Sequence, residues 1–499
     1  MTNIVIEKIS EVYIRIFSDL STEQELSNYF TFDVPGAKFM PAYKARMWDG
    51  KLRLYDLRKK TLYAGLYKYV LAFAAQNDYK VIFQASEEYP RMEPENPVTP
   101  EEMLEFSKAL KPHVNGEPIT IKDYQLDAVV RAINEQRIML ISPTASGKSF
   151  IIYNIMRYLT LNRKKCLIVV PSTGLVEQLY SDFADYSSHV RWDVNDHCQK
   201  IYSGFTKEIS NAVTISTWQS IYKQPKQWFD QFDVIFGDEA HQFKAKSLST
   251  VMEKLDKTVY RIGTTGTIDN KQVHKLVLEG VFGPVHRVTT TKELMDSNDV
   301  AQLSIKCIVL KYTAEERKAQ VKNLYPDEKK FLVTHAKRNK FIKNLALATK
   351  GNTLVLFQYV ENHGIPLYEM IQAGAAEGRK VFIVHGGVDT DEREAIRHIV
   401  EKEQDAIIVA SYGTFSTGIN IKNLHNIIFA SPSKSMIRIL QSIGRGLRKS
   451  STKDEAKLFD ISDDLSHKAW KNHTLGHFVE RIKIYTSEKF NYKIVEVDI

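Results

Sequence analysis

One segment of the sequence has the composition of a phosphate-binding loop: Ser142-Pro143-Thr144-Ala145-Ser146-Gly147-Lys148-Ser149. Its small residues would let backbone N–H groups surround a β-phosphate at the N-terminus of the helix that the loop opens. Lys148 would then reach the β- and γ-phosphates, and the hydroxyl of Ser149 would bind Mg²⁺. The strict pattern has glycine where Ser142 stands, so the loop by itself leaves open a chance match of small residues.

A second segment carries two adjacent acids, Asp238 and Glu239, directly after the apolar run Val234-Ile235-Phe236. A carboxylate at the tip of a strand can hold Mg²⁺, and its neighbour can polarise an attacking water. Adjacent acids after a strand are also common on protein surfaces, so the pair indicates a metal site only in combination with the phosphate-binding loop upstream. Together the two segments predict an ATP hydrolase with Asp238 at the metal and Glu239 at the water.

Apolar segments alternate with amphipathic ones around these residues. Runs of Ile, Val, Leu and Phe without alternation predict strands buried on both faces, hence parallel sheets covered by helices, here two sheets of about five strands each. The predicted strands are Arg137–Ile141, Cys166–Val170, Val213–Ser216, Asp233–Phe236, Arg261–Thr264, Thr353–Phe357, Val381–Val384, Ala406–Ala410 and Asn426–Ala430.

The N-terminal part differs from the rest in charge. The stretch from Lys38 to Lys68 carries nine lysines and arginines against two aspartates, nearly the whole net charge of +8. Residues 4–16 are predicted as a strand, and residues 46–55 as a β-hairpin with Asp49-Gly50 in a type I′ turn. We expect duplex DNA to contact five of the basic residues: Lys51, Arg53, Arg58, Lys59 and Lys60.

Six aromatic residues are interleaved with these charges: Phe39, Tyr43, Trp48, Tyr55, Tyr63 and Tyr67. Such rings can stack at unpaired bases while the cations meet phosphates. The alternative is that the rings form the core of a small module and the charges are merely solvated. We expect most of the rings to be buried.

The predicted organisation is an α/β protein: two tandem parallel-sheet domains preceded by a small α+β nucleic-acid-binding domain. Prolines at 90, 94, 97 and 100 mark a linker, and Thr99-Pro100-Glu101-Glu102 restarts a helix with a capping box. The predicted boundaries are 1–90 for the small domain, 91–117 for linker and helix, 118–285 and 286–465 for the two sheets, and 466–499 for a C-terminal helix and strand.

Composition excludes several classes of protein. The 499 residues are 43% hydrophobic and 26% charged, and no apolar run approaches the roughly 18–20 residues that cross a bilayer. The three cysteines, Cys166, Cys198 and Cys307, are too far apart for a disulfide scaffold or a zinc site. The first residues lack a signal-peptide pattern, so we expect a cytoplasmic protein.

Nine short segments of the sequence form a further pattern, and they include the phosphate-binding loop and the pair of adjacent acids. They are Lys122-Asp123-Tyr124-Gln125, residues 142–149, Val170-Pro171-Ser172-Thr173, Ser216-Thr217-Trp218-Gln219-Ser220, Asp238-Glu239-Ala240-His241, Gly263-Thr264-Thr265-Gly266-Thr267, residues 354–364, residues 414–420 and Gln441-Ser442-Ile443-Gly444-Arg445-Gly446-Leu447-Arg448. From about Lys122 to Arg448 the chain resembles the superfamily-two helicases of DEAH type. The resemblance accounts for Ser142, because the helicase form of the loop relaxes that glycine. Two departures are Gly266, where alanine is usual, and Asn420, where aspartate is commoner.

This resemblance implies two tandem RecA-like domains and a role for further residues. It implies that Gln125 recognises adenine and that residues 143–149 (Pro143, Thr144, Ala145, Ser146, Gly147, Lys148, Ser149) and Gly418 bind the nucleotide. Thr173, Thr217, Trp218 and Thr414 would grip the backbone of the nucleic-acid strand. Arg445 and Arg448, three apart on one helix face, would stabilise charge on the transferring phosphoryl group.

The whole chain, including Trp48-Asp49-Gly50-Lys51, resembles the recombination and replication helicases of T-even bacteriophages, which are RecG-like in role. That resemblance implies a motor that acts on branched DNA: forks, junctions, D-loops and R-loops with their RNA–DNA hybrid. We expect the protein to work as a monomer, and a phage origin would place it in the cytoplasm of a host cell. Residues Pro171-Ser172-Thr173 and 441–445 resemble the corresponding segments of DNA helicases more than those of RNA helicases, so they favour DNA as the substrate. Two alternatives stay open: a double-strand translocase that does not separate strands, and a nucleotide-gated DNA clamp.

Overall fold

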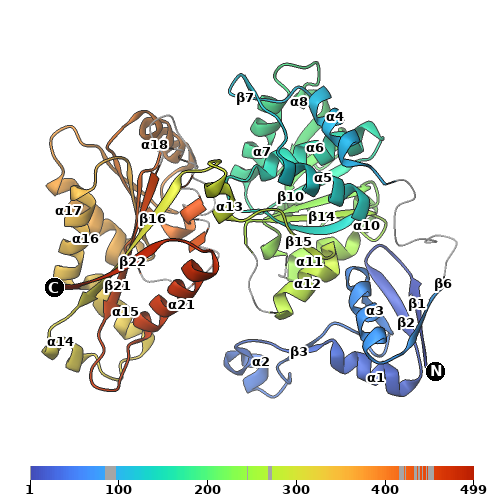
Figure 1. Cartoon of the computed structure of the whole chain (residues 1–499), viewed down its shortest axis with the longest axis horizontal. Helices are drawn as coiled ribbons and strands as arrows, with labels where there is room; N and C mark the ends of the chain where they lie inside the picture. Colours follow the sequence, from blue (N-terminus) through green and yellow to red (C-terminus); the bar gives the residue numbers. More distant parts are fainter. Residues whose placement is uncertain are drawn as a thin grey trace. The chain divides into compact units, whose positions relative to one another are not determined.

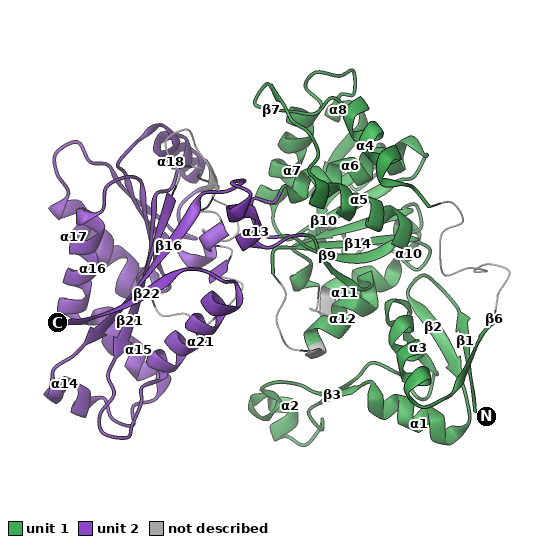
Figure 2. Ribbon diagram, viewed as in Figure 1, with its two compact units in different colours: residues 1–142, 147–288 green, residues 143–146, 289–499 purple. Residues whose placement is uncertain are grey.

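The computed structural model describes residues 2–84, 97–243, 246–267, 272–414, 421, 423–431, 435, 439–440, 442–444, 447 and 455–499. Their contacts divide the chain into two compact units (Figure 2). Unit 1 comprises residues 1–142 and 147–288, and unit 2 comprises residues 143–146 and 289–499. Among the described residues, no helix is long and apolar enough to cross a membrane.

Unit 1 begins with a small α+β module, residues 2–84, built on a four-stranded sheet in the order β5-β2-β1-β6 (Figure 1). Its strands are β1 (Asn3–Lys8), β2 (Tyr13–Phe17), β5 (Thr61–Tyr63) and β6 (Lys80–Gln84), and its longer helices are α1 (Leu20–Tyr29) and α3 (Tyr67–Gln76). The prediction of one strand over 4–16 was wrong, because β1 turns back and pairs antiparallel with β2. Alternate residues of both strands, Ile4, Ile6, Ile14 and Ile16, are buried in the core of the module.

The predicted hairpin over 46–55 was also wrong. Strand β4 (Lys51–Arg53) pairs with the distant β3 (Thr31–Asp33), so that Phe32 lies opposite Leu52. A type I′ turn needs positive φ at both central residues, and of Asp49 and Gly50 only Gly50 has it, at 79°. Residues 34–50, which we call the arm, instead form a loop between β3 and β4 that carries η1 (Ala37–Phe39) and α2 (Pro41–Lys44).

The rest of unit 1 is a parallel seven-stranded sheet in the order β11-β12-β10-β13-β14-β9-β15. Its strands are β9 (Arg137–Ile141), β10 (Cys166–Val170), β11 (Cys198–Ile201), β12 (Val213–Thr217), β13 (Val234–Asp238), β14 (Tyr260–Thr265) and β15 (Val285–Arg287). The flanking helices include α4 (Pro100–Ala109), α5 (Asp123–Glu135), α6 (Lys148–Leu161), α7 (Thr173–Tyr186), α11 (Lys246–Lys254) and α12 (Gln272–Phe282). Neighbouring residues of β10 point to opposite faces of the sheet. Ile168 packs in one hydrophobic cluster, and Leu167 and Val169 pack in another. This two-sided burial explains the continuous apolar runs.

Unit 2 contains a second parallel seven-stranded sheet, in the order β18-β19-β17-β20-β21-β16-β22. Its strands are β16 (Gln302–Lys311), β17 (Thr353–Phe357), β18 (Val381–Val384), β19 (Ile407–Ser411), β20 (Asn426–Phe429), β21 (Glu455–Asp464) and β22 (Tyr492–Asp498). Its helices include α13 (Thr291–Asp296), α14 (Ala314–Ala319), α15 (Tyr325–Thr334), α16 (Ala336–Ala348), α17 (Ile365–Gly374), α18 (Thr390–Lys402) and α21 (His473–Ser487). The predicted fold class, two parallel sheets behind an α+β module, is confirmed, with seven strands in each sheet instead of about five.

The module packs against the large sheet of unit 1 through close backbone contacts. A Cβ atom at Gly65 would lie only 2.0 Å from the carbonyl oxygen of Glu279 in α12. Arg137 at the start of β9 forms an ion pair with the buried Glu11 of the module. Leu276 of α12 belongs to the module's own core cluster. The module is therefore built onto the sheet and does not hang from a linker alone.

Candidate functional site

The phosphate-binding loop connects β9 to α6. Gly147 has φ 81° and Ala145 has φ 70°, values in the left-handed region. The φ of Gly147 favours glycine, and a Cβ atom there would lie 2.4 Å from Nε2 of Gln125 and would have to displace that side chain. Because α6 begins at Lys148, the first N–H groups of the helix are directed toward this loop, as phosphate binding requires.

Gln125 lies against the loop. It is the third residue of α5, is buried, and accepts a hydrogen bond from the backbone N–H of Lys122 at 3.0 Å through Oε1. Its amide nitrogen faces Gly147. The structure thus brings together two segments that are far apart in the sequence and were both predicted to bind nucleotide.

The two polar residues that open α6 have partners within unit 1. Lys148 donates from Nζ to the carbonyl oxygen of Ser142 at 3.3 Å. The hydroxyl of Ser149 lies 2.8 Å from that of Tyr186, at the end of α7. Tyr186 did not stand out in the sequence, where it is one more apolar position of an amphipathic helix.

The adjacent acids lie at the carboxyl end of β13. Asp238 is buried, and Oδ1 accepts a hydrogen bond from the hydroxyl of Thr264 on the neighbouring β14 at 2.7 Å. Burial raises the pKa of the Asp238 carboxyl, the charge of Glu239 raises it further, and Lys148 opposes both effects. A desolvated carboxylate beside a second acid and a lysine suits a divalent cation that carries a phosphate group, so these residues fit Mg²⁺-ATP.

Glu239 has φ 50°, an unfavourable value for a residue with a side chain. Its Oε2 lies 3.3 Å from Nδ1 of His241, and the same nitrogen lies 3.0 Å from the hydroxyl of Thr265. His241 therefore joins the second acid to β14. His241 belongs to the segment Asp238-Glu239-Ala240-His241, but a role for it emerges only from these contacts.

The residues predicted to grip a nucleic-acid strand in unit 1 follow two adjacent strands. Thr173 begins α7 shortly after β10, while Thr217 ends β12 and Trp218 begins α9 (Trp218–Ile221). Nε2 of Gln219 donates to the carbonyl oxygen of Pro171 at 3.3 Å and joins the two segments. Carboxyl ends of parallel strands share one edge of a sheet, so these residues gather at the same edge as Asp238.

Among residues 289–499 of unit 2, the predicted site residue that the structure describes is Thr414, which is buried and accepts a hydrogen bond from Ser411 at 2.9 Å. The predicted residues Gly418, Arg445 and Arg448 lie outside the described residues. The described part of unit 2 thus tests neither the arginine pair nor the glycine.

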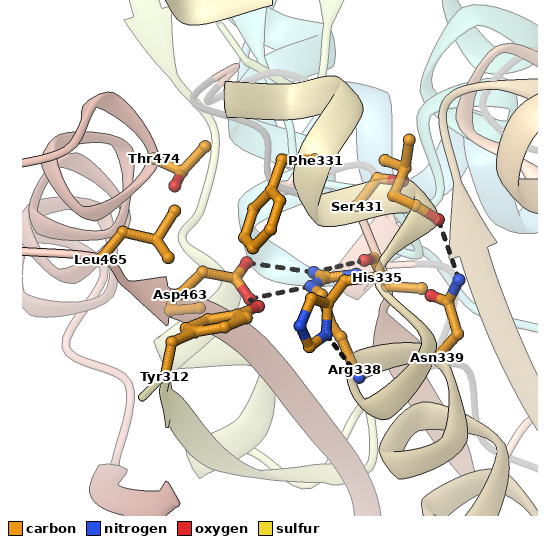
Figure 3. Close-up of polar contacts among 12 residues, drawn as sticks. Tyr312, Phe331, His335, Arg338, Asn339, Ser431, Asp463, Leu465 and Thr474 are labelled. Atoms are coloured by element: carbon orange, nitrogen blue, oxygen red, sulfur yellow. Dashed lines mark hydrogen bonds and ion pairs between the residues drawn. The ribbon is translucent and has the colours of Figure 1, made fainter. Parts of the chain in front are cut away.

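A buried polar network underlies the carboxyl edge of the second sheet (Figure 3). Arg338 of α16 pairs with Asp463 of β21, with Nε to Oδ1 at 2.8 Å, and donates to the carbonyl oxygen of Ala430 after β20. Tyr312 donates to the same carboxylate at 2.7 Å. Ser431 follows Ala430, and its hydroxyl lies 2.9 Å from Nδ1 of His363. The network ties the ends of β20 and β21 to the segment after β17, and no local pattern in the sequence had indicated it.

The basic residues of the module differ in their partners. Nη2 of Arg53 lies 2.5 Å from Asp49, and Nζ of Lys60 lies 2.8 Å from Glu23. Lys51, Arg58 and Lys59 are exposed. Of the six aromatic rings, Tyr55 is buried, Trp48, Tyr63 and Tyr67 are half-buried, and Phe39 and Tyr43 are exposed. The expectation that most of the rings are buried was therefore wrong, and the two exposed rings both lie in the arm.

Comparison with known proteins gives three matches to family models. Residues 2–84 match "DNA helicase UvsW, N-terminal", residues 118–270 match "Type III restriction enzyme, res subunit", and residues 336–450 match "Helicase conserved C-terminal domain". The first match covers the α+β module, and the other two fall on the two parallel sheets.

Individual relatives agree with these matches. The chain is 34% identical to the ATP-dependent DNA helicase uvsW of Enterobacteria phage T4, over 98% of both chains. It is 24% identical to the DNA 3'-5' translocase XPB2 of Sulfurisphaera tokodaii, over 69% of this chain and 81% of that one. The crystal structure of T4 UvsW aligns over 99% of both chains, with 31% identity and a TM-score of 0.52.

Proposed function

The chain belongs to the UvsW family of ATP-dependent DNA helicases, and we propose that it unwinds or branch-migrates branched DNA. Its substrates under this proposal are forks, junctions, D-loops and R-loops, and its role lies in recombination, replication and repair. The observation that supports it best is the module of residues 2–84, whose stretch from Lys38 to Lys68 carries nine lysines and arginines against two aspartates and which packs directly onto the first large sheet. A motor that only followed a single strand would not need such a surface.

ATP hydrolysis in this proposal depends on residues of both sheets. Mg²⁺ would be held by Ser149 and Asp238, and when bound with ATP it supplies positive charge to the phosphates. Lys148 neutralises charge on the β- and γ-phosphates, and Glu239 orients the attacking water. Gln125 binds the adenine edge, residues 143–147 and Gly418 bind the nucleotide, and Arg445 and Arg448 stabilise charge on the transferring phosphoryl group.

The nucleic acid in this proposal meets two surfaces. Thr173, Thr217, Trp218 and Thr414 hold the backbone of one strand, since residues of this kind follow the strands of the two sheets. Lys51, Arg53, Arg58, Lys59 and Lys60 contact the phosphates of the duplex, for which Arg53 and Lys60 must exchange their present acidic partners.

We further propose that the protein works as a monomer, in the cytoplasm of a host cell. The proposed domains are 1–90, 91–117, 118–285, 286–465 and 466–499, and the three family matches, to residues 2–84, 118–270 and 336–450, fall within three of them.

The decisive experiment compares strand displacement from a forked duplex with displacement of a third strand from a triplex. A helicase for branched DNA separates the fork with ATP and Mg²⁺, and Lys148→Ala abolishes this because the phosphate contact is lost. A double-strand translocase would displace the triplex strand and leave the fork intact. A nucleotide-gated clamp would bind ATP stoichiometrically and show little DNA-stimulated turnover.

A further inference from the structure

The arm, residues 34–50, presents large apolar side chains to solvent. Phe39 is 70% exposed, Met40 43%, Tyr43 41% and Met47 83%. None of the four belongs to the core cluster of the module, which includes the nearby Leu54 and Tyr55. In Figure 1, α2 lies at the end of the module away from β1 and β2. Four large apolar side chains exposed on one short segment point to a ligand.

The arm is folded, so these exposures belong to a defined structure. The backbone N–H of Val34 donates to the carbonyl oxygen of Gly50 at 2.8 Å and closes the loop above β3 and β4. Within it, the N–H of Met47 donates to the carbonyl oxygen of Ala42 at 2.9 Å. A Cβ atom at Gly50 would lie 3.0 Å from the ring of Tyr43, so that ring packs closely on the glycine. The part of the arm from Lys38 to Met47, which we call the tip, is thus held in shape by contacts within the arm.

Three cations surround the apolar side chains: Lys38, Lys44 and Arg46, all exposed. Nζ of Lys38 lies 5.2 Å from the centre of the Phe39 ring. The carboxylate of Asp49, at the end of the arm, is already occupied by Arg53. An apolar groove on a protein would leave the three cations desolvated without counter-charges, which is costly. A nucleic acid satisfies both chemistries, with phosphates for the cations and base faces for the apolar side chains.

Duplex DNA offers phosphates to the cations but no free base faces to the apolar side chains, because its bases are stacked on one another. Unpaired bases beside a phosphate backbone offer both, and they occur together with duplex where strands part. We propose that the tip of the arm is a branch-point contact, in which Phe39 and Met47 cover unpaired bases while Lys38 and Lys44 bind the flanking phosphates. This inference rests on the proposed function and names the part of the module that distinguishes a branch from plain duplex.

The test compares three variants of the full chain with the wild type. Phe39→Ala with Met47→Ala removes apolar surface, Lys38→Gln with Lys44→Gln removes charge, and Leu20→Ala is the control. Leu20 is 79% exposed on α1 of the same module but lies outside the arm. Affinity is measured for a fork with 2-aminopurine at the branch point and for a duplex of equal length. Basal ATPase and thermal unfolding confirm that each variant is folded.

The apolar variant is expected to bind the fork at least about fivefold more weakly, since stacking on one base is worth ~1–3 kcal/mol, and to lose the change in 2-aminopurine fluorescence. Its affinity for duplex and its salt dependence stay unchanged. The charge variant weakens binding to both DNAs, and its log–log salt dependence on duplex flattens by about 0.9 for each lost phosphate contact. Leu20→Ala behaves as wild type.

Other outcomes overturn the proposal. If wild type prefers the fork and the apolar variant keeps that preference, the arm does not contact the branch point, while the branched-DNA function stands. If the apolar variant binds the fork normally but changes the mass of the protein in solution, the arm is a protein contact. If wild type neither prefers nor separates the fork, the proposed function itself fails, and the arm proposal falls with it.

Discussion

The hydroxyl of Thr264 donates a hydrogen bond to Oδ1 of the buried Asp238 across 2.7 Å. The two residues lie 26 positions apart in the sequence and are partners in the register of β13 and β14. A strand that carries no acid of its own therefore holds the carboxylate that we propose for the metal.

Thr264→Val should weaken the use of Mg²⁺-ATP. Hydrogen bonds to charged groups are worth about 1.5–3 kcal/mol, so the Mg²⁺ concentration for half-maximal ATPase should rise roughly tenfold or more. Thr258→Val is the matched control, since Thr258 loses a buried hydrogen bond to Phe232 without touching Asp238. Equal Mg²⁺ dependence in the two variants would show that Thr264 is merely structural.

Glu239→Gln should bind ATP with Mg²⁺ and hardly cleave it. The side chain keeps its shape and loses its charge, and a positioned base contributes about 10²–10⁴ in rate. Single-turnover hydrolysis and equilibrium nucleotide binding are measured on the same protein. Loss of nucleotide binding would instead assign Glu239 to the metal or to the structure around His241.

Gly65→Ala should disturb the packing of the module on α12, because the new methyl would lie 2.0 Å from the carbonyl oxygen of Glu279. Overpacking of this kind costs about 1–3 kcal/mol. We expect lower thermal stability and a larger loss of fork unwinding than of basal ATPase. Gly476→Ala in α21 is the control, with open space around it. Fork unwinding as in that control would mean that this packing does not serve the reaction.

Arg338→Met should destabilise the fold by about 3–5 kcal/mol, because it leaves Asp463 buried without its cation. The double variant Arg338→Met with Asp463→Asn should recover part of the loss, since the neutral amide can still accept from Tyr312. Urea unfolding of wild type, both single variants and the double variant gives the coupling free energy. A coupling near zero would contradict a paired, buried interaction.

Acid should destabilise the protein through His363. Burial, and then the charge of Arg338, lower the pKa of His363 from 6.5 to about 3. The unfolded chain therefore binds the proton first, so this stability is complete above pH 6.5 and is lost as the pH falls toward 3. Between pH 6.5 and 5 wild type should lose about 2 kcal/mol more than His363→Gln in urea unfolding. If the free energy of unfolding of the two proteins changed with pH in parallel, the assignment of this pH dependence to His363 would be wrong.

Much of the framework follows from the sequence because its cause is local. Strands β9, β10, β17 and β18 have the predicted bounds, and in the first three the continuous apolar run matches burial on both faces of the sheet. The capping box at Thr99 is present as predicted, because its hydrogen bonds join residues three apart. The segments with the phosphate-binding loop and the adjacent acids also lie where predicted, at the ends of β9 and β13.

The strands β16 and β21, which contain polar residues, were not predicted from the sequence. Strand β16 alternates exposed and buried positions over its first half, and β21 carries buried acids, Asp460 and Asp463. Each acid is compensated by a buried arginine from a helix, Arg481 or Arg338. The arginine partner of each acid is remote in sequence, so composition alone made β21 unlike a core strand.

The sequence by itself determined the class of protein, the segments that we propose to bind phosphate and metal, and the two parallel sheets, because apolar periodicity and short motifs are properties of neighbouring residues. Only the tertiary structure decided that Thr264 holds Asp238, that Tyr186 meets Ser149, and that β4 pairs with β3 so that the tip of the arm stays exposed. Such contacts depend on strand register and on which faces pack together. Both are set by the whole fold, since each requires residues distant in the chain to come within hydrogen-bond or van der Waals distance.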